Sequence, residues 1–483
     1  GPRRDFDELS RVARPSRFRI YSLFDCSTAT LQNRSSLRSR FSSFSEISIS
    51  MRGRKLHKKP DRFSGYLNQA METMPPGERD EYQNHLLREI VRYAHRHSPR
   101  VGKTFRAAAI TPEDIQSVRD LEKVPITEKA SLILLQKIDP PFGGLLTTPY
   151  NRLKKIYLTP GPIFVPEAKQ SRYWRWQTAF YAAGFRKGDI VQVTLSYHLT
   201  PGGWMLEEPL HSLGCTVIAA GVGNLDAQVK IMCELGVTGF VGMPGFLRSL
   251  GDHAEKLDLD LKQDLSLEVS FLTIELLTET MRKDIEERFA MVARQGYGTA
   301  EVGAIAYECM ENRGMHIADD LILEIVDPET GKQLGPGEVG EVVVTLFNKA
   351  YSLIRFGTGD LSYYDDDPCP CGRTSARLPR LVGRVDQVTK VRGVFIHPYQ
   401  TDQLMSQYPE TGNYQVVITR GERADEMTFH IELETEHIDR ERLKIRLQDA
   451  IKEALKLRGK VEFIPKGSIP GDAKTIEDKR DWH

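Results

Sequence analysis

The sequence predicts an α/β protein that ends in a small α+β domain, and three observations carry this prediction. Apolar, β-branched runs at 190–195, 215–219, 238–242 and 267–274 alternate with helix-like segments at 226–235 and 278–290, as in a mostly parallel sheet. Strand-like runs at 322–326 and 340–346 follow, separated by a turn at 327–331. The last block, 385–483, combines two strands near 414–420 and 427–434 with an amphipathic helix near 438–457.

The first fifty residues differ from the rest, because they carry nine Arg, no Lys and twelve Ser without a sustained apolar period. They fit either an organelle leader or translated sequence upstream of a natural start at Met51. The acidic residues Asp5, Asp7 and Glu8 disagree with a leader, so we favour the second explanation. We expect segment 1–50 to be non-native or disordered and to contribute no chemistry.

The section from 51 to 150 contains few glycines and is predicted to be mainly helical. Apolar residues at 86, 87, 90, 91 and 94 follow helical spacing until Pro99 ends the run. Together with the strands that follow, this section predicts a large N-terminal domain over 51–383. The small C-terminal domain then covers 384–483.

Composition excludes several classes of protein. The 483 residues carry 66 basic and 66 acidic side chains and a net charge of zero, which argues against a surface built to hold nucleic acid or an anionic membrane. No window approaches 18 consecutive apolar residues, so we expect no transmembrane helix. We therefore expect a cytoplasmic protein with no nucleic-acid or membrane partner. Six cysteines are too few for a disulfide scaffold of this length.

Three glycine-containing motifs carry the chemistry. They are QGYGTAEVG at 295–303, IRFGTGDL at 354–361 and GRVDQVTKVRGVFIHP at 383–398. Each alone is a plausible turn, but their order and separation resemble the adenylate-forming (acyl-CoA synthetase) superfamily. The strongest resemblance is to the phenylacetate–CoA ligase family, and it covers about 60–480.

This resemblance implies a large AMP-binding domain with mixed sheets and flanking helices, followed by a small mobile C-terminal domain. It also implies that ATP and Mg²⁺ activate a small carboxylic acid, which we expect to be aromatic. An acyl-adenylate would form first, and coenzyme A would then accept the acyl group. Dimers are common in this family, so a homodimer is an open expectation.

The resemblance also assigns roles to individual residues. Glu301 would hold Mg²⁺ near the phosphates, and Tyr297 would stack on adenine within a pocket formed with Gly298, Thr299 and Glu275. Asp360 would bind the ribose, because a carboxylate can accept from both hydroxyls of a cis-diol. Arg384 and Lys390 complete the nucleotide site. Arg384 and Asp386 would form the hinge on which the small domain swings.

A second set of residues points to a metal. Cys309 and His316 are followed by the tight pair Cys369 and Cys371, and three cysteines with one histidine form one tetrahedral zinc set. Some members of the resembled family carry the same pattern, which implies a structural zinc. A closed set of four ligands leaves no position for a catalytic water.

Three segments depart from the family pattern. The phosphate loop, normally rich in Ser, Thr and Gly with a lysine, is here YLTPGPIFVPEAK at 157–169. Its three prolines donate no N–H, so Thr159, Gly161 and Lys169 are the remaining candidates for phosphate contact. Ile274 replaces a small residue beside the expected adenine position. The adenylating lysine aligns with Asp472, and Lys474 is either its substitute or a surface lysine.

The acyl pocket is expected beside the segment 196–203 and the stretch 242–245. Tyr197, His198 and Met243 are the candidate substrate contacts, although His198 is better explained as a hydrogen-bonded structural residue. Two alternative functions stay open. In the first, the adenylate reacts with a different acceptor, such as an amine or a carrier-protein thiol, or a nucleotide is transferred to a cofactor. In the second, the altered loops mark a protein that has lost adenylation and only binds an acyl-CoA or a partner.

Overall fold

The computed structural model describes residues 61–385, 389–391, 394–396, 398–420, 425–435, 438–471 and 473–480. Segment 1–50, Asp386 and Asp472 lie outside the described residues, and so does the side chain of Lys390. The predictions made for these residues therefore stay predictions.

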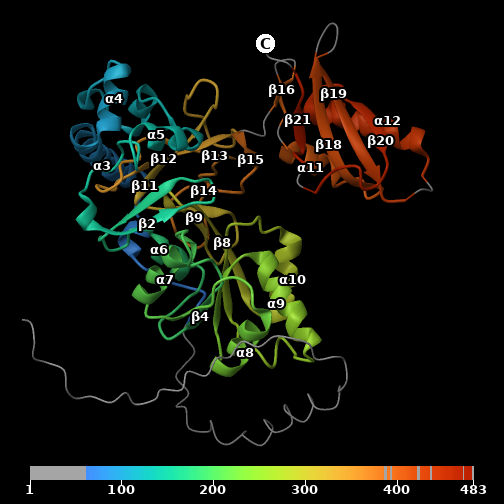
Figure 1. The fold of residues 1–483 in the computed structure, drawn as a ribbon, viewed down its shortest axis with the longest axis horizontal. Helices are drawn as coiled ribbons and strands as arrows, with labels where there is room; N and C mark the ends of the chain where they lie inside the picture. Colours follow the sequence, from blue (N-terminus) through green and yellow to red (C-terminus); the bar gives the residue numbers. More distant parts are fainter. Residues whose placement is uncertain are drawn as a thin grey trace, which may run out of the picture. The chain divides into compact units, whose positions relative to one another are not determined.

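An eight-stranded sheet forms the centre of the large N-terminal part (Figure 1). The four apolar runs predicted as strands form β4 (Ile190–Val193), β5 (Thr216–Ala219), β6 (Gly239–Gly242) and β7 (Val269–Leu272). They pair in parallel in the order β7-β6-β4-β5, and β7 also pairs in parallel with β8 (Val292–Thr299). On its other side β8 pairs antiparallel with β9 (Gly303–Glu308), and β10 (Met315–Ile317) and β14 (Arg377–Leu378) extend the sheet. The sheet is therefore mixed, and β8 is where its pairing changes direction.

Helices cover both faces of this sheet (Figure 1). On one face lie α6 (Trp176–Ala182) and α7 (Gly202–Ser212), and on the other lie α8 (Leu225–Leu235), α9 (Pro244–Lys256) and α10 (Glu279–Phe289). Alternation along β7 supplies both interfaces: Phe271 packs in the core with Phe180, while Leu272 packs in the core with Leu247. A strand buried on both faces reads as a continuous apolar run, which is why the sequence revealed it.

A second sheet has the order β1-β13-β12-β11, with β15 pairing β13. Its strands are β1 (Thr127–Glu128), β11 (Leu321–Val326), β12 (Gly340–Leu346), β13 (Phe356–Ser362) and β15 (Gly383–Arg384). The predicted helical section supplies α2 (Gln69–Glu72), α3 (Pro76–His97), α4 (Pro99–Ala107) and α5 (Leu132–Ile138). Leu87 and Val91 of α3 pack with Ile322 of β11. Pro99 separates α3 from α4 and occupies the first turn of the latter, where a missing N–H costs nothing.

The C-terminal part has its own sheet and its own core. The sheet has the order β20-β19-β18-β21, formed by β18 (Thr411–Arg420), β19 (Asp425–Leu433), β20 (Lys460–Ile464) and β21 (Ile476–Asp478). The helices are α11 (Pro398–Met405) and α12 (Arg440–Leu455), and β16 (Thr389–Val391) pairs with β17 (Val394–Ile396). Leu443, Leu447 and Ile451 of α12 recur at helical spacing and pack with Phe429. The predicted α/β fold with a small α+β part at its end is confirmed.

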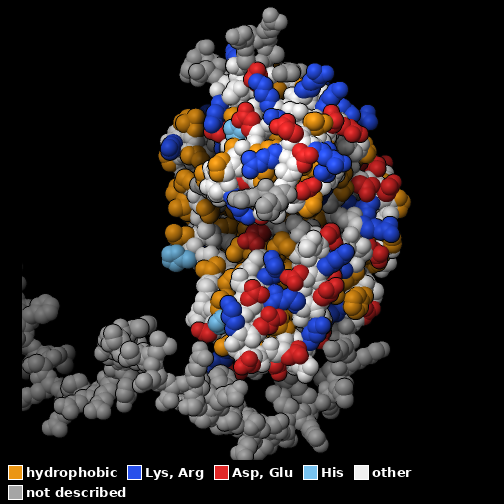
Figure 2. Space-filling model, turned by 90° about the vertical axis from the view of Figure 1, so that its right-hand side faces the viewer, with side chains coloured by type: hydrophobic (Ala, Val, Ile, Leu, Met, Phe, Trp, Pro, Cys, Tyr) orange, Lys and Arg blue, Asp and Glu red, His pale blue; other side chains and the backbone are white. Residues whose placement is uncertain are grey.

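The surface carries mixed charge. On the face drawn in Figure 2, basic and acidic side chains lie next to one another rather than in large patches of one sign. Within the described ranges, none of the helices has both the length and the apolar composition that crossing a bilayer requires.

Candidate active site

Several of the predicted site residues lie where the parallel strands end. In open α/β sheets the loops after the strands form one edge, and ligands bind there. Here β8 ends in the loop that carries Glu301, and β7 ends in the loop 273–276. The second sheet adds Asp360 from β13 and Arg384 from β15, which are paired across the two strands.

Asp360 is held by residues of all three motifs. The hydroxyl of Tyr297 donates to Oδ2 at 2.8 Å, and Nη1 of Arg384 donates to Oδ1 at 2.7 Å. Gly359 has a φ of +78°, and a Cβ there would lie 2.9 Å from Nη2 of Arg384, so the position requires glycine. Burial raises the pKa of Asp360, and the Tyr297 hydroxyl and the Arg384 guanidinium oppose that rise.

Tyr297 itself is packed in the core. Its burial, and to a smaller extent the charge of the nearby Asp360, raise the pKa of its hydroxyl well above the ordinary value. Its hydroxyl is engaged with Asp360 and lies 3.2 Å from Oγ1 of Thr358. The stacking on adenine expected of Tyr297 stays a prediction. The contact that the structure describes makes Tyr297 a positioning residue for Asp360.

Glu301 is a buried carboxylate whose oxygens are left available. Its side chain is 0% exposed, and neither oxygen accepts a hydrogen bond from a described residue. Nζ of Lys129 lies 3.1 Å from Oε2 as an ion-pair partner. Thr299 accepts a hydrogen bond from the N–H of Val302 at 3.2 Å and so closes the turn that carries Glu301. A Cβ at Gly298 would lie 2.2 Å from the carbonyl oxygen of Gly303, so no side chain fits there.

Lys129 is the residue that the sequence analysis missed. It opens a short 3-10 turn directly after β1, 172 positions before Glu301, and no motif marks it. The sequence offered only an indirect signal. The predicted phosphate loop has no lysine between its prolines, so a cation that binds phosphate would have to come from another segment.

The phosphate loop is the tip of a hairpin formed by β2 (Leu153–Leu158) and β3 (Phe164–Ala168). The N–H of Thr159 donates to the carbonyl of Ile163 at 3.0 Å, and the Thr159 hydroxyl accepts from the N–H of Ile163 at 3.2 Å. Gly161 stands free at the tip, where an added Cβ would meet only the Thr159 hydroxyl, at 4.0 Å. Lys169 does not serve this loop, because its Nζ donates to the carbonyl of Asn151 at the other end of the hairpin.

The remaining candidates lie on four other segments. Oε2 of Glu275 accepts from the N–H of Gly245 at 3.0 Å, in the first turn of α9. Tyr197 packs against Trp204 and Gly203, whereas His198 is exposed and its N–H donates to the Ser196 hydroxyl.

Met243 is half-buried directly before α9. Lys474 is exposed, and its carbonyl accepts from Gln415 just before β21. Its predicted role in adenylation stays a prediction.

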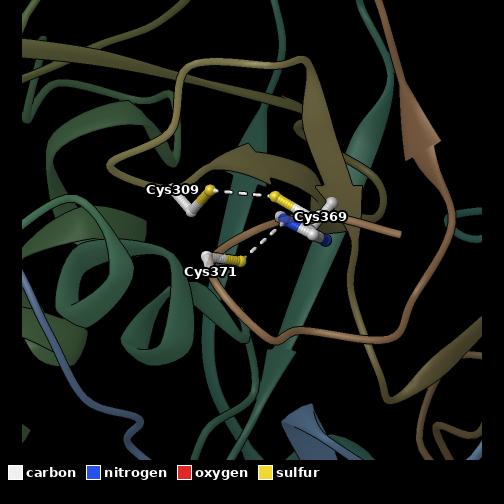
Figure 3. A group of neighbouring side chains, drawn as sticks. Cys309, Cys369 and Cys371 are labelled. Atoms are coloured by element: carbon white, nitrogen blue, oxygen red, sulfur yellow. Dashed lines mark hydrogen bonds between the residues drawn. The ribbon is translucent and has the colours of Figure 1, made fainter. Parts of the chain in front are cut away.

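The three cysteines and the histidine come together in one cluster (Figure 3). Their ligand atoms all lie within 4.8 Å of one another. Sγ of Cys309 is 3.8 Å from Sγ of Cys369, and Sγ of Cys371 is 3.4 Å from Nε2 of His316. Nδ1 of His316 lies 3.2 Å from the carbonyl of Ser375, a contact that orients the imidazole. The cluster joins the end of β9 to the loop that precedes β14.

Comparisons with known proteins agree with this architecture. The AMP-binding enzyme family matches residues 169–346, and the AMP-binding enzyme C-terminal domain matches residues 393–480. The phenylacetate–coenzyme A ligase of Thermus thermophilus is 28% identical over 430 residues, which cover 83% of this chain and 95% of that protein. The phenylacetate–coenzyme A ligase of Escherichia coli is also 28% identical, over 85% of this chain and 97% of its own length.

Solved structures give the same result. A crystal structure of 2-hydroxyisobutyryl-CoA ligase in the postadenylation state superposes with a TM-score of 0.70 at 25% identity, and covers 88% of this chain and 94% of that one. The predicted relationship is therefore confirmed: the chain belongs to the AMP-binding, or adenylate-forming, enzyme superfamily, and it is a homologue of phenylacetate–coenzyme A ligases.

Proposed function

We propose that the protein activates an aromatic carboxylic acid with Mg-ATP and transfers the resulting acyl group from an acyl-adenylate to coenzyme A. That the chain is an AMP-forming acid–thiol ligase follows from its superfamily and its homologues. The aromatic acid and the residue roles are the proposal.

One observation carries the residue assignment. Two carboxylates of the candidate site, those of Asp360 and Glu301, differ in their hydrogen bonding. Asp360 is oriented by a hydroxyl and a guanidinium, whereas Glu301 is buried without a hydrogen-bond donor among the described residues. Lys129 is its ion-pair partner, but a buried carboxylate whose oxygens accept no hydrogen bond is incompletely compensated, so a ligand is expected to complete the Glu301 site.

The two carboxylates suit different parts of a nucleotide. Asp360 would accept the ribose hydroxyls, with Tyr297 and Arg384 holding its oxygens in place. Glu301 would bind Mg²⁺, which takes oxygen ligands, and the metal would neutralise charge on the phosphates. Lys129, the ion-pair partner of Glu301, would bind the same phosphates and supply the cation that the hairpin tip lacks.

The cysteine–histidine cluster fits a structural zinc ion. Two thiolates about 2.3 Å from zinc at a tetrahedral angle lie about 3.8 Å apart, which equals the distance between Cys309 and Cys369. Cys309, His316, Cys369 and Cys371 would fill all four positions. Bound zinc would hold the end of β9 to the loop before β14, so it supports the fold rather than the chemistry.

ATP–pyrophosphate exchange tests the proposal. We expect exchange that requires Mg²⁺ and an aromatic acid such as phenylacetate, and thioester formation when coenzyme A is added. The variant E301Q should exchange at least about 100-fold more slowly, because it removes the charge that binds the metal. E234Q, an exposed carboxylate on α8, is the matched control and should exchange at the wild-type rate. Tight AMP binding without exchange for any acid would refute the ligase assignment.

A further inference from the structure

The turn that carries Glu301 is held by contacts to its backbone. Arg175 is buried, and its Nη2 donates to the carbonyl of Val302, the residue directly after Glu301. The same nitrogen lies 3.5 Å from the carbonyl oxygen of Ala304, and Nη1 donates to the carbonyl of Tyr173 at 3.0 Å. One guanidinium therefore joins the turn after β8 to the segment that precedes α6.

The segment before α6 also packs directly on this turn. The N–H of Ala304 donates to the carbonyl of Trp174 at 3.0 Å. Gly303 has a φ of +84°, and a Cβ there would lie 2.7 Å from the same carbonyl oxygen, so the two backbones meet without a side chain between them. The turn after β8 is therefore supported by the backbone of Trp174 and by the side chain of Arg175.

Arg175 has a backbone conformation that an arginine disfavours. Its φ is +62°, and although it is the N-cap residue of α6, its side chain makes no capping hydrogen bond to that helix. A left-handed conformation costs free energy for a residue other than glycine, and it persists where the surrounding contacts determine it. Nε lies 3.4 Å from Oδ1 of Asp320, which gives the buried charge an ion-pair partner. The side chain of Arg175 thus supports the turn rather than the helix that it precedes.

The two carboxylates of the candidate site are held in different ways. Asp360 is oriented through its own oxygens, which accept from Tyr297 and Arg384. Glu301 forms an ion pair with Lys129 but accepts no hydrogen bond from a described residue. Its place is therefore fixed by the backbone of its turn. A carboxylate held in this way keeps oxygen lone pairs for a metal ion.

We infer that Arg175 is a positioning residue for Mg²⁺ binding, because it holds Glu301 in place through the carbonyl of Val302. This inference rests on the proposed function, in which Glu301 binds the metal. Without the guanidinium the turn should shift, and a displacement of about 1 Å is enough to cost a site much of its effect. Asp360 belongs to β13 of the second sheet, so AMP binding should change little.

Calorimetry with the ATP analogue α,β-methylene-ATP tests the inference without turnover. The quantity measured is the Mg²⁺ factor, which is the ratio of the dissociation constants of the analogue without Mg²⁺ and with saturating Mg²⁺. R175M should lower the Mg²⁺ factor about tenfold and change AMP affinity less than about twofold. R175K keeps the charge and can reach one carbonyl, so it should lower the factor only about threefold.

R172M is the matched control. Arg172 lies three positions earlier and also has a positive φ, of +57°. It is exposed, however, and its Nη2 donates to the Thr178 hydroxyl rather than to the turn. R172M should therefore keep the wild-type Mg²⁺ factor.

E301Q separates this inference from the proposed function. A wild-type Mg²⁺ factor in E301Q would refute the metal-binding role of Glu301 and the inference with it. A reduced factor in E301Q beside a wild-type factor in R175M would overturn the inference alone. Equal losses of AMP and analogue affinity in R175M would show that Arg175 only supports the fold, which would also overturn it.

A second variant keeps the test decisive if R175M does not fold. D320N removes the ion-pair partner of Arg175, and the Asp320 side chain is 42% exposed, so this variant should fold. It should lower the Mg²⁺ factor about twofold, because the guanidinium keeps its bonds to the turn. Wild-type factors in both D320N and R175K would overturn the inference.

Discussion

Removing the Tyr297 hydroxyl tests how the pKa of Asp360, the carboxylate proposed to bind ribose, is set. In Y297F the ring remains in the core, but Asp360 loses the donor that lies 2.8 Å from its Oδ2. Burial already raises the pKa of Asp360, and the Tyr297 hydroxyl lowers it. The variant should therefore raise the pKa of Asp360 further.

The size of the shift follows from the contact. A hydrogen bond to a charged group is worth about 1.5–3 kcal/mol, and about 1.4 kcal/mol corresponds to one pKa unit. The Asp360 side chain is only 16% exposed, so solvent screens little of this interaction. We expect the pKa of Asp360 to rise by about one to two units. Ribose binding needs the ionised carboxylate, so affinity falls as pH drops through that pKa, and the fall should begin at a correspondingly higher pH in Y297F.

Calorimetric titration of AMP between pH 4.5 and 8 measures this directly. Near pH 8 the carboxylate is ionised in both proteins, so their affinities should be similar. Y414F is the matched control, because Tyr414 also donates to a carboxylate, that of Asp402, in the C-terminal part. An acid limb that does not move in Y297F, or that moves equally in Y414F, would refute the reasoning.

Three further results are expected. K129M should raise the KM for ATP about tenfold while leaving AMP affinity nearly unchanged, because Lys129 is proposed to bind the phosphates that AMP lacks. An equal loss of both in initial-rate and calorimetric measurements would contradict this. T159V should weaken ATP binding about fivefold, since it removes the hydrogen bond, worth about 1 kcal/mol, that the Thr159 hydroxyl accepts at the hairpin tip. An unchanged KM for ATP would show that this hydrogen bond does not contribute to ATP binding. Metal analysis should find one zinc per chain, and C371S should lose it with a lower midpoint in differential scanning calorimetry; full zinc content in C371S would exclude Cys371 as a ligand.

The sequence predicted the structure well where the pattern of adjacent residues determines whether a segment is a strand or a helix and which side it buries. The strands β4, β6 and β7 are buried on both faces, so their apolar runs were visible without any tertiary information. The predicted helix 438–457 corresponds to α12, because Leu443, Leu447 and Ile451 recur at helical spacing on one buried face. The proximity of Cys309, His316, Cys369 and Cys371 could be predicted, because a set of four metal-ligand residue types at this spacing is uncommon by chance.

The sequence alone did not predict contacts between segments that are far apart along the chain. Nothing near Lys129 indicates that it meets Glu301, because the pairing depends on how β1 joins β13 in the second sheet. The hydrogen bonds by which Thr159 closes the hairpin could not be predicted, because they depend on the side-chain geometry of a loop that contains several prolines. The exposure of Ile274 was also hidden, since an isoleucine after a strand normally predicts burial.

The cysteine–histidine cluster has a consequence for laboratory practice. Cys309 follows β9, whose residue Ala306 pairs with Tyr297, and the loop of Cys369 and Cys371 leads through β14 to Arg384. Two of the groups that orient Asp360 are thus attached to segments that meet at the cluster. If the cluster holds the proposed zinc ion, a purified batch with incomplete zinc content should contain two populations of molecules with different nucleotide affinity. Active-site titration would then report fewer sites than chains, and metal content should be known before any rate constant is compared between batches.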